Sequence, residues 1–183
     1  QQRDVFWDIH CTICLGSRKS CLEQAGNSMR EALWCCRDRL CRVQAWRDAE
    51  TEQVTFDRRY CMDTAQKKRF QVAAECLDEE RFQQELEECF RTVLSREDLN
   101  GQMLEDWFFQ VLEACLYGMQ QNGQAEERFA ENMEEKFWLC TDAQSVLQLL
   151  RQDISRELRR LGDERSLREM RPITEAKHYL QQH

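Results

Sequence analysis

The sequence predicts an all-α fold, which we expect to be a disulfide-stapled bundle of about five to seven helices in a single domain. Three features of the composition indicate this class. One proline and six glycines among 183 residues leave few of the turns that β-hairpins need. Glutamine, glutamate, arginine and leucine, which are good helix formers, dominate the chain. Eleven cysteines are typical of a secreted disulfide scaffold.

The first 61 residues contain seven of the cysteines. A helix is expected over about residues 21–48, because apolar side chains recur there at helical spacing: Leu33, Trp34, Leu40, Val43 and Trp46. Residues 50–56 are expected to form an irregular or briefly extended connection. A helix then resumes near Asp57 and runs toward Cys76.

Three amphipathic helices occupy the middle of the chain. The first spans residues 78–95 and has an apolar face of Phe82, Leu86, Cys89 and Val93. The second is bounded by Asn100-Gly101 and Asn122-Gly123, and its broad apolar face predicts that it is the central helix. The third repeats the pattern with Met133, Phe137 and Cys140. Cysteine therefore occupies core-facing positions, which predicts disulfides that tie helix to helix.

The last predicted helix begins at Thr141 or Asp142 and contains no cysteine. Gly162 can end it, and Pro172 can break the charged segment after it. We therefore expect a disulfide-braced helical domain over residues 1–162 and a charged C-terminal helical segment or tail over 163–183. The last helix is the expected dimer or partner surface, and its apolar residues are Leu147, Leu150, Ile154, Leu158 and Leu161.

All eleven cysteines are predicted to serve as disulfide partners: Cys11, Cys14, Cys21, Cys35, Cys36, Cys41, Cys61, Cys76, Cys89, Cys115 and Cys140. Their spacing does not give the connectivity. Adjacent Cys35 and Cys36 point about 100 degrees apart on a helix, so each should have a different partner. Because the count is odd, one thiol is left over, and we expect it to be Cys140, Cys11 or Cys14. That thiol can link two chains into a homodimer.

The sequence offers little for catalysis. Its three histidines are His10, His178 and His183, and no nucleophile elbow, HExxH pair or phosphate-binding glycine loop is present. Cys11 and Cys14 have the spacing of a redox or zinc motif, but no second pair accompanies them. We expect no cofactor and no metal site, and a thiol–disulfide redox protein is the third hypothesis for function.

Two stretches invite comparison with known families. The cysteines at 35, 36 and 41 suggest the pair that precedes the catalytic histidine of secreted phospholipases A2, but no histidine lies there. The spacing from Cys61 to Glu87-Glu88-Cys89 is similar to stanniocalcins, which are secreted, disulfide-linked dimeric hormones. The chain also resembles large helical venom or haemolymph proteins of invertebrates. No residue is carried over from these families.

Charge and hydropathy restrict the partners. Residues 75–136 carry 5 basic and 17 acidic side chains, which argues against nucleic-acid binding. No apolar run reaches the roughly 18 residues that a membrane span needs. The chain starts with glutamine, as expected after removal of a secretory signal.

Our leading hypothesis is a secreted, non-enzymatic interaction protein, hormone-, toxin- or haemolymph-like, that signals by binding a protein partner or receptor. The alternative is an extracellular carrier that holds a lipid or other small apolar ligand. For the carrier, the predicted lining residues are Trp107, Phe108, Val111 and Phe137.

Overall fold

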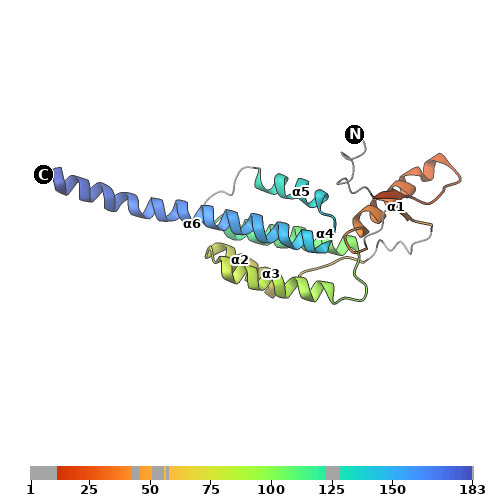
Figure 1. Ribbon diagram of the computed structural model, residues 1–183, viewed down its shortest axis with the longest axis horizontal. Helices are drawn as coiled ribbons and strands as arrows, with labels where there is room; N and C mark the ends of the chain where they lie inside the picture. Colours follow the sequence, from red (N-terminus) through yellow and green to blue (C-terminus); the bar gives the residue numbers. More distant parts are fainter. Residues whose placement is uncertain (1–11, 43–45, 51–55, 57, 123–127, 183) are drawn as a thin grey trace, which may run out of the picture.

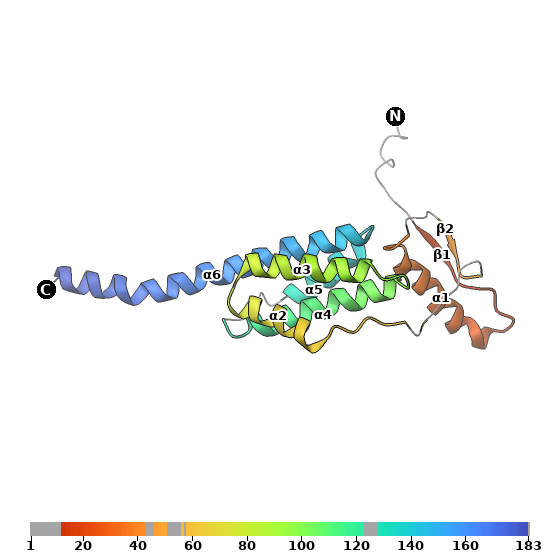
Figure 2. The same cartoon turned by 90° about the horizontal axis from the view of Figure 1, so that it is seen from below.

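The computed structural model describes residues 12–42, 46–50, 56, 58–122 and 128–182, without the side chains of 46, 47 and 171–182. The described chain is mostly helical, which confirms the predicted all-α class. Figures 1 and 2 show helices running side by side along the long axis of the molecule, with α1 at one end. The described α-helices are α1 (Ala25–Asp38), α2 (Thr64–Glu75), α3 (Glu79–Leu94), α4 (Gly101–Met119), α5 (Phe129–Leu139) and α6 (Ala143–Gln182).

Helix α4 is the central helix, as predicted. It contacts α1, α2 and α6, and twelve of its nineteen residues are buried. Two glycines permit these close approaches. A Cβ atom at Gly101 would overlap the backbone carbonyl of Arg37 on α1, and one at Gly118 would overlap the carbonyl of Gln71 on α2. The backbones of three helices therefore meet at positions where only glycine fits.

Side-chain caps fix where four of the helices begin. Asp63, Asp78, Asn100 and Asp142 each accept a hydrogen bond from the amide three residues further on, at 2.7–3.0 Å. Such a cap contributes about 1 kcal/mol. The predicted start of the second helix near Asp57 is therefore wrong, since the described residues 58–63 are not helical. Most of the predicted connection at residues 50–56 lies outside the described residues.

The N-terminal part has a small structure that the sequence did not indicate. Strand β1 (Ile13–Leu15) pairs in parallel with β2 (Trp46–Asp48). In the sequence, a short 3-10 helix (Leu22–Gln24) and α1 separate the two strands. The predicted helix over residues 21–48 is wrong at its carboxyl end. Backbone hydrogen bonds close turns over residues 37–42, and residues 46–48 pair with β1 as a strand.

The main core runs through the whole bundle, and its aromatic side chains pack ring against ring. The Phe108 and Phe137 ring centroids lie 4.7 Å apart, and those of Phe90 and Trp107 lie 5.3 Å apart. A second, smaller cluster contains Trp34, Cys35 and Ala49, with Cys14 packed against it. The N-terminal strands and α1 thus have a small apolar core of their own.

Helix α6 is longer than predicted. It begins at Ala143 and continues through Gly162 and Pro172 to Gln182, so the predicted helix end at Gly162 is wrong. Ion pairs within the helix span Gly162, since Arg160 pairs with Glu164, and Glu164 also pairs with Arg168. Figures 1 and 2 show α6 running along the bundle and then extending well beyond it.

Candidate functional site

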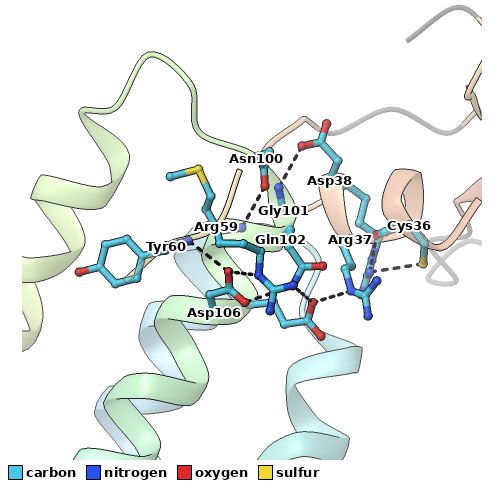
Figure 3. Close-up of polar contacts among 12 residues, drawn as sticks. Cys36, Arg37, Asp38, Arg59, Tyr60, Asn100, Gly101, Gln102 and Asp106 are labelled. Atoms are coloured by element: carbon cyan, nitrogen blue, oxygen red, sulfur yellow. Dashed lines mark hydrogen bonds and ion pairs between the residues drawn. The ribbon is translucent and has the colours of Figure 1, made fainter. Parts of the chain in front are cut away.

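A polar cluster joins α1 to the amino end of α4 (Figure 3). The Asp38 side chain, which is 1% exposed, accepts a hydrogen bond from the Gly101 amide at 3.0 Å. The Asn100 side chain accepts one from the Met103 amide at 2.9 Å. The first turn of a helix carries amides without intrahelical partners and the positive end of the helix dipole. Asp38 therefore stabilises the start of α4 from a different helix.

The next turn of α4 contributes a partly buried ion pair. The Glu105 carboxylate lies 2.5 Å from Arg37 Nε and accepts a hydrogen bond from Gln102 at 2.8 Å. Burial raises the pKa of Glu105, and the positive charge of Arg37 opposes that rise. Figure 3 shows Arg37 and Asp38 reaching α4 from neighbouring positions on α1. The two helices are thus held together by two adjacent charged contacts.

Asp106 attaches a third segment to the same turns of α4. Its carboxylate accepts hydrogen bonds from Arg59 Nε at 2.9 Å and from the Tyr60 amide at 3.1 Å (Figure 3). This contact holds the extended chain before α2 against α4. Each of the carboxylates of Asp38, Glu105 and Asp106 therefore has an amide or cationic partner. The cluster is a structural joint between three segments of the chain.

Ten of the eleven predicted disulfide cysteines lie in the described residues, and Cys11 lies outside them. The structure shows no disulfide bond between the described cysteines, so their pairing stays a prediction. Cys35 is buried and Cys36 is half-buried, and the prediction that each has a different partner stays a prediction. The other described cysteines are buried at positions 89, 115 and 140, half-buried at 14 and 41, and exposed at 21, 61 and 76.

The prediction that three successive helical cysteines face the core is confirmed for Cys89, Cys115 and Cys140. Cys89 Sγ lies 3.5 Å from the Tyr60 hydroxyl and 3.2 Å from Trp107 Nε1. Burial is the main cause that raises the pKa of all three thiols. A raised pKa disfavours the thiolate, which is the reactive form.

The four residues predicted to line an apolar-ligand cavity are fully buried: Trp107, Phe108, Val111 and Phe137. They fill the core by packing against their neighbours, so a ligand could not contact them without displacing core side chains. The carrier hypothesis itself stays a prediction. An apolar groove that the sequence did not indicate lies instead between α4 and α5, where Phe109, Leu116 and Tyr117 line it.

The apolar face of α6 that was expected to bind a partner packs inside the protein itself. Leu147, Leu150, Ile154, Leu158 and Leu161 are all buried in the main core. The arginines beside them also bind within the chain, since Arg151 pairs with Glu87 and Arg159 with Glu79 on α3. A partner could reach these five side chains only by opening the bundle.

Two exposed apolar side chains lie further along α6, beyond the packed part. Leu167 is 65% exposed and Met170 is 56% exposed. They lie three residues apart and therefore on the same side of the helix. Sequence reasoning missed this pair because the surrounding residues are mostly charged. The spacing of Leu167 and Met170 was the available signal.

Comparisons with protein families, curated proteins and solved structures find no match to this chain. Among the described residues, no helix is both long enough and apolar enough to cross a membrane. Those residues also contain no group of three or more histidine, cysteine or acidic side chains arranged to hold a metal ion.

Proposed function

We propose that this chain is a secreted, non-enzymatic interaction protein that acts by protein binding, and that the end of α6 binds a second copy of the chain. The observation that carries the proposal is the exposure of Leu167 and Met170, which follow the buried part of α6. Exposed apolar side chains grouped on one helix side are typical of protein-binding surfaces.

The stability of the α6 end also favours a partner. Isolated helices in water are marginal unless an apolar face is packed. Gly162 and Pro172 disfavour helix by about 1 and 3 kcal/mol relative to alanine. Ion pairs such as Arg165–Glu169 stabilise the helix by only about 0.3–0.5 kcal/mol each. Burial of Leu167 and Met170 on another chain would add about 1.5–3 kcal/mol for each side chain.

Charge indicates a second copy as that partner. The net charge of -8 is concentrated in residues 75–136, which carry 5 basic and 17 acidic side chains, so these regions of two copies repel each other. Residues 163–183 carry four basic and four acidic side chains, so this segment can approach its own copy with little repulsion. An antiparallel pairing about a two-fold axis between Arg168 and Glu169 places Leu167 of each copy against Met170 of the other. The apolar pair is therefore complementary to itself.

A double substitution tests this surface. The variant Leu167→Glu/Met170→Glu should be monomeric under conditions where the wild-type chain forms dimers, because four carboxylates would meet at the interface. Light scattering coupled to size-exclusion chromatography gives the mass. The matched control is Leu22→Glu/Met29→Glu, which changes the same residue types at exposed positions outside α6 and should still form dimers.

A conservative swap of the two side chains distinguishes loss of the apolar contact between copies from loss of the fold. Leu167→Met/Met170→Leu keeps two apolar side chains on the same side of α6, so it should keep the dimer. Equal helical circular dichroism in all variants excludes unfolding as the cause of any loss. Dimers of unchanged mass in the glutamate variant would contradict the proposal, as would loss of the dimer in the Leu22/Met29 control.

The extracellular location and the disulfides are part of the same proposal. Eleven cysteines exceed what a reducing compartment tolerates without metal or catalytic use. About five intrachain disulfides would leave one thiol, which can join two copies covalently. The apolar contact at Leu167 and Met170 needs no disulfide, so dimers should persist after reduction even if electrophoresis of the oxidised protein shows linked chains.

A further inference from the structure

Two cysteines far apart in the sequence line one groove. Cys36 lies near the carboxyl end of α1, and Cys140 follows the last residue of α5, before α6 begins. The same groove is lined by Thr12, Arg39, Trp138, Leu139, Thr141 and Asp142. It therefore separates the end of α1 from the α5–α6 turn.

The Arg39 guanidinium bridges the two sides of the groove. Nη1 donates a hydrogen bond to the Cys36 carbonyl at 2.6 Å and lies 3.6 Å from Cys36 Sγ. Nη2 donates to the Trp138 carbonyl at 2.8 Å and to the Cys140 carbonyl at 3.1 Å. One planar group thus contacts both cysteine residues, which requires their backbones to be close.

Other contacts fix these two segments relative to each other. The Ala143 amide donates to the Leu40 carbonyl at 2.9 Å, which joins the chain after α1 to the first turn of α6. The Arg37 guanidinium lies 5.8 Å from the centre of the Trp138 ring. A cross-link across the groove would therefore join two segments that hydrogen bonds already hold to each other.

We propose that Cys36 and Cys140 form an intrachain disulfide that closes the end of α1 onto the α5–α6 turn. The proposal depends on the extracellular location proposed above, where disulfides persist. It removes Cys140 from the expected candidates for the leftover thiol. It also gives Cys36 a partner distinct from that of Cys35, which lies in the separate Trp34 cluster.

The oxidant would be a small-molecule disulfide or the disulfide of a thiol oxidoreductase. Cys36 is the more exposed thiol, so its thiolate attacks one sulfur of that disulfide and releases one thiolate. The Cys140 thiolate then attacks Cys36 Sγ of the mixed disulfide and releases the second. The two cysteines lose two protons and two electrons, and the oxidant becomes two thiols.

Peptide mapping of the full chain tests the pair. The chain is refolded with reduced and oxidised glutathione, remaining thiols are alkylated, and trypsin then gives peptides 31–37 and 137–151. These two peptides should be joined by a disulfide, and fragmentation should assign the bond to Cys36 rather than to Cys35. Reductant should separate them.

Two variants keep the test specific. Cys36→Ser should lose the linked peptide and leave Cys140 alkylated, whereas Cys76→Ser, at an exposed cysteine, should retain the link. The wild-type map decides even if a variant fails to fold. Alkylated Cys36 or Cys140 in the refolded wild-type chain, or a bond from either to another cysteine, would overturn the proposal. The map does not depend on dimerisation, so the two proposals can fail separately.

Discussion

The two halves of α6 differ in what holds them as helix. Over residues 143–161 the apolar side chains are buried in the bundle, and Arg151 and Arg159 pair with acidic residues of α3. Beyond Gly162 the ion pairs lie within the helix, and Leu167 and Met170 are exposed. A single helix thus passes from a part whose apolar face is buried in the bundle to a part whose ion pairs are local and whose described contact with the bundle is polar, from Arg165 to the Asn122 side chain at 3.3 Å.

Replacing an apolar side chain by alanine should give the largest difference in stability between the two halves of α6. Ile154→Ala removes a fully buried side chain, so it should lower the free energy of unfolding by about 2–5 kcal/mol. Leu167→Ala removes an exposed one and should change the monomer by less than about 0.5 kcal/mol. Urea denaturation at protein concentrations where the chain is monomeric measures both. Equal losses would show that the end of α6 packs on the body.

Glycine substitutions compare a tightly packed backbone position on α4 with an open one on α6, and their effects should have opposite signs. An added Cβ at Gly118 would overlap the Gln71 carbonyl, so Gly118→Ala should destabilise the fold by about 1–3 kcal/mol. Gly162 has nothing near its added Cβ, so Gly162→Ala should raise helix stability by up to about 1 kcal/mol. Thermal unfolding followed by circular dichroism tests both. A destabilising Gly162→Ala would mean that α6 bends there.

Breaking an ion pair should give the smallest difference in stability between the two halves of α6. Asp153 is nearly buried and lies 2.6 Å from Lys136 of α5, so Asp153→Asn should cost about 1–3 kcal/mol. Glu169→Gln breaks an exposed pair with Arg165 and should cost at most about 0.5 kcal/mol. Urea denaturation at low and high salt separates them, because salt screens the exposed pair more strongly. If both variants respond alike, the two environments are not distinct.

The sequence predicted the helices of the bundle well because their signals are local. Apolar spacing and a capping residue at Asp78 or Asn100 lie within one turn of the helix start that they predict. Strands β1 and β2 could not be predicted in this way, since each has three residues and its partner lies beyond α1. The carboxyl end of α1 was missed because the strand that follows it, β2, pairs with a segment that lies before α1 in the sequence.

The candidate sites were harder to predict than the helices. The apolar face of α6 around Ile154 was interpreted as a partner surface, and the structure buries it. Periodicity reveals that a helix has an apolar face, but not whether that face meets its own bundle or another chain. The role of Arg39 depends on Trp138 and Cys140, which lie about a hundred residues away, so no local pattern indicates it.

Sedimentation equilibrium of the full chain over a range of concentrations, with and without reductant, tests whether two copies associate through the end of α6. The mass should rise with concentration from the 22.0 kDa of one chain toward twice that value. The rise should occur in reductant as well, because the proposed interface is apolar rather than covalent. A mass of 22.0 kDa at every concentration would show that the end of α6 does not bind a second copy.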